Sequence, residues 1–135
     1  MTALAADRNT PERAGDQFVY PVAATTLIYA GSIVMLNAAG DATKGATATG
    51  QICVGRAEQQ VNNTGAAGAA TISVSKGVFR WANSAAGDAI TKAEIGDNCY
   101  IVDDQTVAKT DGTSTRSVAG KIVDVDSSGV WVLMV

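Results

Sequence analysis

Residues 117–134 read SVAGKIVDVDSSGVWVLM, and this stretch decides the fold class. Two runs rich in β-branched residues, Ser117 to Val125 and Val130 to Met134, flank the cluster Asp126-Ser127-Ser128-Gly129. Glycine and aspartate accept the tight backbone geometry that a short turn between two strands requires. The stretch therefore predicts a β-hairpin.

The same pattern of short apolar runs between Gly, Asn, Asp and Ser clusters recurs upstream and predicts further strands. These are Gln17 to Val22, Thr26 to Tyr29, Ser32 to Asn37, Gln51 to Val61, Ala70 to Ser75, Gly77 to Trp81, Cys99 to Val102 and Thr106 to Lys109. We expect a turn at residues 38–41, and mobile loops at 43–49 and at 62–69, the latter with nothing to bury. One or two helical turns are expected between Ala85 and Ile95, with Asp88 as a cap.

This organisation predicts an all-β fold, with a body that is a small β-roll, a jelly-roll-like structure or a β-barrel. A chain of 135 residues is long enough for one modest core. Residues 1–16 carry alternating charges and no apolar period, so they predict an extended N-terminal arm. We therefore expect the arm at 1–16 and a single β domain at 17–135.

A faint internal repeat is visible in the sequence. Residues 31–37 resemble 96–103, residues 50–54 resemble 120–124, and each set precedes an apolar strand, 70–74 or 130–134. One interpretation is two similar β-halves that share one core. The other is two ordinary hairpins with the same strand pattern.

The residue types disfavour catalysis. The chain has no histidine, which removes the commonest general base and the commonest metal ligand. Carboxylates at 103, 104, 111, 124 and 126 could gather around a cation, but they fall where turns and solvated strand faces are expected. No phosphate-binding glycine motif occurs. The sequence predicts a protein that is not an enzyme and that has no catalytic residues, metal site or cofactor.

Charge and hydropathy also restrict the partners. The formal charge is -3 and no basic block occurs, so the electrostatic pattern typical of nucleic-acid binding is missing. No apolar run reaches the length of a membrane-spanning helix. We therefore expect neither a nucleic acid nor a membrane as a partner.

Five further side chains are informative. Cys53 and Cys99 lie in apolar runs and are expected to be buried reduced thiols, although one bridge between two strands stays open. Phe79 and Trp81 share one strand face and Arg80 points the other way. Core packing is the favoured role of Trp81, and Arg80 with Trp81 forms a candidate oligomer or capsid interface, because Trp and Arg are common at interface hot spots.

Several strings carry a family resemblance. They include Asn-Ala-Ala-Gly-Asp at 37–41, Ile-Cys-Val-Gly-Arg-Ala at 52–57, Ile-Ser-Val-Ser-Lys-Gly-Val-Phe at 72–79, and Ala-Asp-Arg-Asn-Thr-Pro at 6–11. The chain resembles the head decoration, or cement, proteins of Mu-like tailed phages and more distantly those of the lambda type. It departs from the lambda type in its extra segment at 85–97.

The resemblance implies a structural virion protein that binds the outer surface of a tailed-phage capsid and stabilises the lattice of the major capsid protein. It implies a homo-oligomer, a dimer or a trimer, on capsid symmetry axes, and synthesis in the cytoplasm of a bacterial host. The arm would lie across neighbouring capsid subunits. Its candidate capsid-binding residues are Asp7, Arg8, Asn9, Thr10, Pro11 and Arg13.

Two other functions stay open. One is a small carbohydrate-binding or receptor-binding β-module of a phage virion, although the loops are rich in Ala, Gly, Thr and Ser rather than aromatic residues. The other is an enzyme with an aspartate-based site, for which loss of a hydrolytic activity in Asp103→Ala or Asp124→Ala would be the sign.

Overall fold

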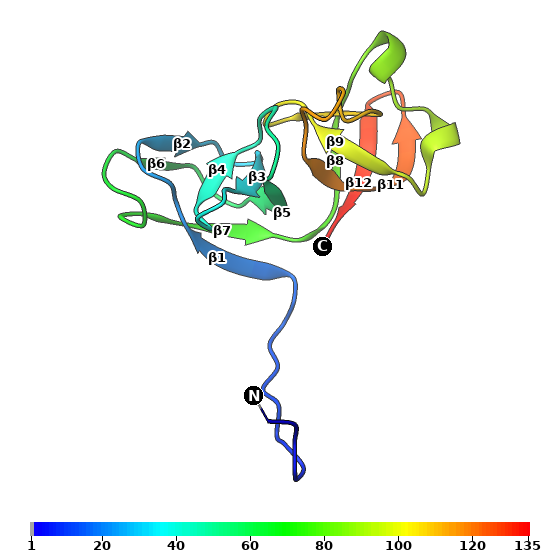
Figure 1. Ribbon diagram of the computed structural model, residues 1–135. Coiled ribbons are helices and arrows are strands. Elements are labelled where there is room, and N and C mark those ends of the chain that lie inside the picture. The colour runs from blue at the N-terminus through cyan, green and yellow to red at the C-terminus, as the bar shows by residue number, and fades with distance from the viewer. Residues whose placement is uncertain (1) are drawn as a thin grey trace.

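The computed structural model describes residues 2–135 and is built almost entirely of β-strands (Figure 1). The strands are β1 Gln17–Pro21, β2 Thr26–Ile28, β3 Ile33–Leu36, β4 Ala42–Lys44, β5 Ile52–Ala57, β6 Val61–Asn63, β7 Thr71–Ser75, β8 Gly77–Asn83, β9 Asn98–Ile101, β10 Thr106–Ala108, β11 Val118–Asp126 and β12 Gly129–Met134. Two single 3₁₀ turns, η1 Ala86–Asp88 and η2 Lys92–Glu94, separate β8 from β9. The predicted all-β class, with a barrel in the body, is confirmed.

The strands form two halves that lie side by side (Figure 1). The N-terminal half is a five-stranded sheet in the order β1-β7-β5-β3-β4, accompanied by the β2–β6 pair. The C-terminal half is a closed barrel in the order β10-β8-β12-β11-β9. Within each half the strands are antiparallel, except where β10 meets β8. β7 and β8 are separated by one residue, Lys76, so the halves follow each other directly.

The strand register shows that the two halves are copies of one plan. In the N-terminal half Val34 of β3 pairs with Gly55 of β5, and in the C-terminal half Cys99 of β9 pairs with Gly120 of β11. Each pair adjoins a bulge at the equivalent step. A methyl group on either glycine would collide with the next strand, at 2.1 Å from the Ser75 carbonyl oxygen or 2.3 Å from that of Leu133. Both copies therefore need glycine at this position.

The outer strands follow the same correspondence. Phe18 of β1 pairs with Val74 of β7, and Phe79 of β8 pairs with Val132 of β12. The C-terminal barrel closes through the parallel pairing of β8 with β10. At the equivalent place the N-terminal half has one parallel bridge between Val22 and Ala42. The N-terminal half is thus a nearly closed version of the same barrel.

The internal repeat seen in the sequence is therefore a repeat of structure, with one correction. The sequence comparison aligned Gly50 with Gly120, whereas the register places Gly55 there. The reason is that a bulge position is fixed by contact with a neighbouring strand and not by similar residues along the chain.

The two halves do not share a single core, contrary to the interpretation from sequence. One cluster of buried side chains fills the C-terminal barrel, and a second fills the N-terminal half. Strand β3 separates them, because alternate residues point to opposite faces. Ile33 and Met35 join the first cluster and Val34 the second.

Three local predictions are wrong in detail. Residues 42–44 form strand β4 where part of a loop was expected, because β3 offers them a pairing edge. The single strand expected at 51–61 is broken between Ala57 and Val61 into β5 and β6. The one or two helical turns expected between Ala85 and Ile95 are present as two isolated 3₁₀ turns, of which η2 is capped by Thr91 with Glu94, but their expected cap is wrong. Asp88 is not a cap and instead binds Arg116, at 3.2 Å.

The loop expected to have nothing to bury contains a buried anchor. Asn63 is 3% exposed. Its side-chain amide donates to the backbone carbonyls of Val22, Ala23 and Ala66, and its side-chain oxygen accepts from the N–H of Gly65. These bonds join the start of the loop to the β1–β2 connection and to its own middle residues. The loop is therefore tied to the body at its start.

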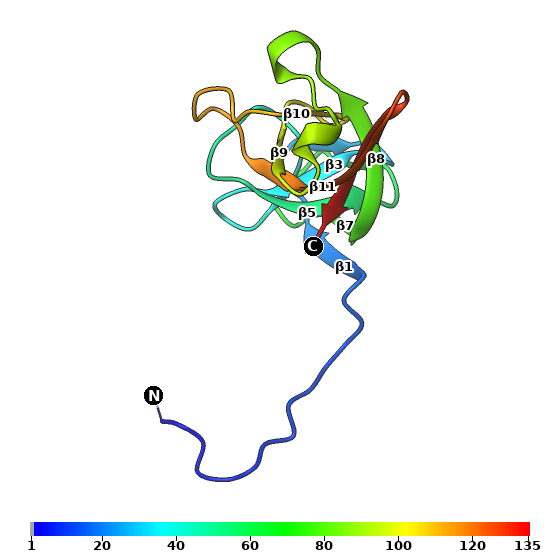
Figure 2. The same ribbon diagram turned by 90° about the vertical axis from the view of Figure 1, so that its right-hand side faces the viewer.

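Residues 2–16 form the predicted arm, and residue 1 lies outside the described range. The arm contains no strand or helix, and every residue in it is exposed. Figures 1 and 2 show it leaving the body at β1 and extending away from both halves. Within residues 2–135, no helix has the length and apolar character needed to span a membrane.

Candidate docking face

Three of the carboxylates considered as catalytic or metal-binding candidates, Asp103, Asp124 and Asp126, are engaged in local structure. Asp126 accepts hydrogen bonds from the indole N–H of Trp131 at 2.9 Å and from the backbone of Ser128 at 2.7 Å, and these bonds lower its pKa. Asp124 accepts from the N–H of Val125 and pairs with Lys92, which also lowers its pKa. Each carboxylate thus stabilises the end of the β11–β12 hairpin.

The other carboxylates do not assemble either. Asp103 accepts a hydrogen bond from the backbone of Gln105 in the turn before β10. The backbone carbonyl of Asp111 accepts from the N–H groups of Thr115 and Arg116. Across residues 2–135, no group of three His, Cys, Asp or Glu side chains is placed to hold a metal ion.

Both cysteines are free thiols, and they are poor nucleophiles. Cys99 is fully buried, and Cys53 is half-buried with its Sγ 3.9 Å from the Sδ of Met134. Burial raises the pKa of Cys53 to about 11 and that of Cys99 to about 12. The expected reduced state agrees with the structure, although only Cys99 is fully buried.

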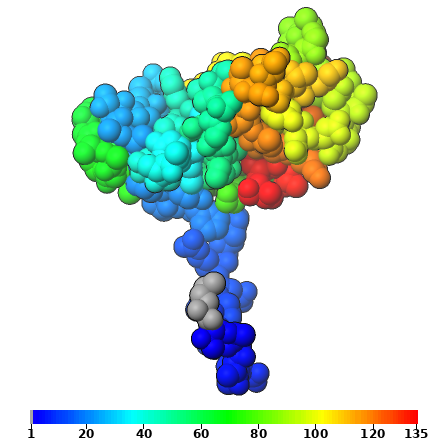
Figure 3. Space-filling view, viewed as in Figure 1, coloured from blue at the N-terminus to red at the C-terminus, as the bar shows by residue number. Residues whose placement is uncertain are grey.

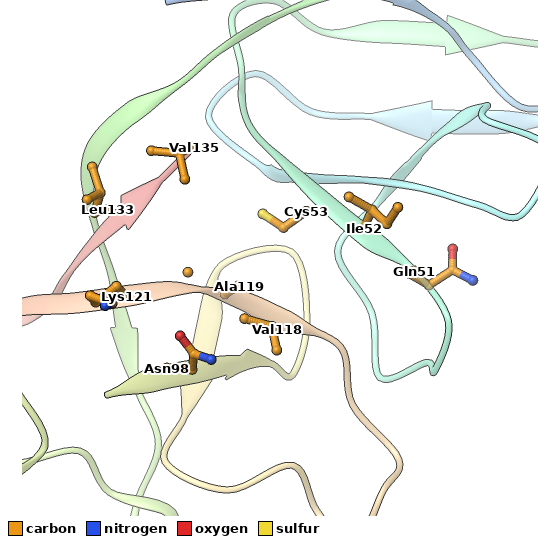
Figure 4. Close-up of a pocket in the computed structure, with 10 residues that line it drawn as sticks. Gln51, Ile52, Cys53, Asn98, Val118, Ala119, Lys121, Leu133 and Val135 are labelled. Carbon is orange, nitrogen blue, oxygen red and sulfur yellow. The ribbon is translucent and has the colours of Figure 1, made fainter. Parts of the chain in front are cut away.

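The most distinct hollow is an apolar groove of about 570 Å³ between the two halves (Figure 4). One wall is the start of β5, and the other is the start of β11, so the walls are the equivalent strands of the repeat. The side chains of Ile52, Val118 and Val135 line it and are 66%, 42% and 85% exposed. We call this the β5–β11 groove.

Each wall of the groove has backbone that lacks a neighbour on one side. The pairing of β5 with β7 covers only Arg56 and Ala57, and the Val54 carbonyl accepts from the Lys76 side chain, which leaves residues 52–53 without a backbone partner on that edge. The pairing of β11 with β12 begins at Lys121 and Gly120 already lies against Leu133, which leaves residues 118–119 without a backbone partner on their edge. An open strand edge in an apolar groove is suited to binding an extended peptide.

The arm leaves the body next to this groove. A second hollow, of about 370 Å³, is lined by Gly15, Asp16, Phe18 and Lys76, and it shares Val135 with the groove. In Figures 1 and 3 the arm root and the C-terminal residues lie on the same underside of the body. We call the groove, this hollow and residues 2–16 together the docking face.

The predicted arm residues do not all behave alike. Asp7, Arg8 and Asn9 are exposed, and no hydrogen bond or ion pair joins them to the rest of residues 2–135. Thr10 and Pro11 are likewise exposed. Arg13 instead stacks on the body, with its guanidinium carbon 4.8 Å from the centre of the Phe18 ring. Arg8 is thus the available cation of the arm, and Arg13 helps to fix its root.

The Arg80–Trp81 candidate interface needs a correction. Trp81 is 5% exposed and packs edge-on against Phe79 in the core of the C-terminal barrel, so its ring is not presented to a partner. Arg80 is exposed and lies over the ring of Trp131, at 5.7 Å. The tryptophan that accompanies Arg80 at the surface is therefore Trp131, on the opposing strand β12.

Sequence reasoning missed the β5–β11 groove. Its apolar residues lie in ordinary strand patterns, where such residues usually fill a core. The only available signal was the repeat itself, because the two walls are equivalent strands.

Searches with this chain found no matching family model, no matching curated protein and no matching solved structure.

Proposed function

We propose that this protein is a structural virion protein that binds the outer surface of a tailed-phage capsid and stabilises the lattice of the major capsid protein. One observation carries the proposal beyond the resemblance in sequence. An exposed arm and an apolar groove lie on the same side of the body. Such a face is suited to binding another protein.

The arm has the properties of a segment that becomes ordered on a partner. Leu4 is the only large apolar side chain among residues 2–16, so the arm cannot bury enough surface to fold by itself. On a shell, many copies of the protein each make one modest contact. Together they stabilise the assembled lattice, because mass action favours the state to which each copy binds. A weak single site is therefore sufficient for cementing.

The groove adds apolar area to the same face. Ile52, Val118 and Val135 are exposed in the free protein, and covering each would contribute about 1–2 kcal/mol. Cementing by this face thus combines an ordered arm with burial of a groove.

Deletion of residues 2–12 tests the proposal. This truncation keeps Arg13 on Phe18 and keeps the Asp16 carbonyl that accepts from the Lys76 N–H at 2.8 Å. We expect the truncated protein to melt like the full chain but to lose most of its occupancy on expanded, undecorated phage shells, measured by co-sedimentation. Undiminished occupancy would reject the arm as the binding element, and failure of the full chain to bind shells would reject the function.

The alternative function, a carbohydrate-binding or receptor-binding module of a virion, has one observation in its favour. A shallow hollow of about 370 Å³ is lined by Arg56, Phe79, Arg80 and Trp131, which include two cations and a partly exposed indole. The indole N–H is already bonded to Asp126, which leaves the ring face as the binding element. Glycan binding that Trp131→Ala abolishes, without any shell binding, would favour this function.

A further inference from the structure

The β5–β11 groove lacks an occupant within the body of its own chain. Its apolar residues are exposed, and the backbone at 52–53 and 118–119 has an unpaired edge. An occupant must therefore supply both an apolar side chain and extended backbone.

The arm contains a segment of this kind. Residues 2–6 read TALAA, in which Leu4 is 73% exposed and is flanked by small residues. In an extended segment Leu4 and Ala6 point to the same side, so both can face a groove while the backbone pairs with a strand edge. The small neighbours let the backbone approach closely.

Charge at the rim of the groove also matches the arm. Lys121 lines the groove and is exposed, and no ion pair involves it among residues 2–135. Asp7 follows Leu4 by three residues and is likewise without a cationic partner in the described chain. With Leu4 in the groove, the Asp7 carboxylate would come near the ammonium group at its rim.

Length decides which copy the arm reaches. The chain from Leu4 to Gly15 spans about 36 Å when extended, which is close to the diameter of about 35 Å expected for a body of this size. The root of the arm already adjoins its own groove through Val135, so reaching that groove would require residues 5–14 to loop back. In Figure 2 the arm instead extends away from the body.

We propose that copies of this chain exchange arms, with Leu4 of one copy seated in the β5–β11 groove of its neighbour. The inference builds on the proposed function, because a shell holds copies side by side and leaves residues 8–12 to contact the capsid between them. Each copy then receives one arm and gives one, so two copies can swap arms reciprocally or several copies can close a ring.

The native thiol of Cys53 makes the inference testable, because it lines the groove. In Leu4→Cys, the two thiols of neighbouring copies would form a disulfide, with a mild added thiol oxidant taking up the two electrons and two protons. The reaction is run at alkaline pH, since burial raises the pKa of the Cys53 thiol to about 11. The oxidised protein, in solution at high concentration and on shells, is separated on a denaturing gel without reductant.

We expect most of the Leu4→Cys protein to run as linked dimers and larger species. The double variant Leu4→Cys/Cys53→Ser and the mid-arm variant Thr10→Cys should stay largely monomeric. Linked species that persist in the double variant would show random contact between arms and overturn the inference. A compact cross-linked monomer would show that the arm enters its own groove, and no linkage in either setting would show that the groove does not take Leu4. Both results overturn it.

The same experiment separates the two proposals. Shell binding without linkage would leave the cementing function standing and remove arm exchange. Linkage in solution without shell binding would support arm exchange and remove the cementing function.

Discussion

Replacing Gly120 with alanine is the sharpest test of the duplicated architecture. The new methyl carbon would lie 2.3 Å from the carbonyl oxygen of Leu133 and 2.9 Å from a methyl group of Val132. A carbon and an oxygen in contact keep about 3.3 Å between them. β11 and β12 would therefore have to separate by about 1 Å where their pairing begins.

The cost can be worked from these contacts. Overpacking of a tightly packed site costs about 1–3 kcal/mol, and loss of the first hydrogen bond of the ladder adds about 1 kcal/mol. We expect Gly120→Ala to lower the free energy of unfolding by about 3 kcal/mol. For a chain of this length the melting temperature should fall by about 10 °C.

The repeat supplies a second test site. Gly55→Ala places its methyl carbon 2.1 Å from the Ser75 carbonyl oxygen, and the backbone φ of +133° adds strain for any L-residue. We expect it to destabilise the protein at least as much. Gly87→Ala is the control, because a methyl group there meets nothing within 4 Å and the backbone is not left-handed. That change should be neutral or stabilise by up to about 1 kcal/mol.

Urea unfolding followed by tryptophan fluorescence measures all three variants. The midpoints of Gly120→Ala and Gly55→Ala should both fall, with the slope of the transition unchanged. If Gly120→Ala unfolds at the same urea concentration as Gly87→Ala, the close approach of β11 to β12 is refuted.

Two further predictions concern the buried amide and the hairpin carboxylate. Asn63→Ala should lower the free energy of unfolding by about 2–3 kcal/mol, because the buried carbonyls of Val22 and Ala23 lose their donor. Asn62→Ala, at the exposed neighbouring position, should change the free energy of unfolding little. Thermal melting measures both variants. In the folded protein the hydrogen bond from the Trp131 indole N–H lowers the pKa of Asp126 below its unfolded value of 3.8. The Asp126 carboxylate therefore stabilises the fold above that pH, and this stabilisation is lost as the pH falls through the lower folded pKa. Melting temperatures of the wild type and Asp126→Asn should therefore differ near neutral pH and converge in strong acid, and a constant difference would contradict this.

Local chemistry explains why much of the fold is predictable from sequence. The turn at 126–129 was found because Asp126 itself accepts from the backbone of Ser128 and Gly129, a contact contained in four residues. Strand positions were found because alternation is also a local pattern. Strand β4 was missed because residues 42–44 are short and partly polar. They form a strand only because Met35 and Leu36 lie beside them.

The groove was unpredictable for a different physical reason. Ile52 and Val118 occur in strands that are otherwise buried, so their residue types resemble core positions. They are exposed because the pairing of each strand with its neighbour stops short, at Arg56 in one half and at Lys121 in the other. Where a pairing stops is decided by the path of a distant segment. The prediction that Trp81 lies at an interface was wrong for a related reason, since strand alternation does not say which face of β8 is covered by the core.

The two copies of the repeat differ mainly in their connections, and this has a use in engineering. The connection from β1 to β3 contains β2, whereas the equivalent connection from β8 to β9 contains η1 and η2. The connection from β5 to β7 contains β6 and its loop, whereas the equivalent connection from β11 to β12 is only a tight turn. In Figure 1 these excursions lie at opposite ends of the body, away from the underside that carries the arm. Foreign peptides inserted near Gly87 or at 66–67 would project from those ends. The protein thus offers two display positions per copy that leave its binding surface unaltered.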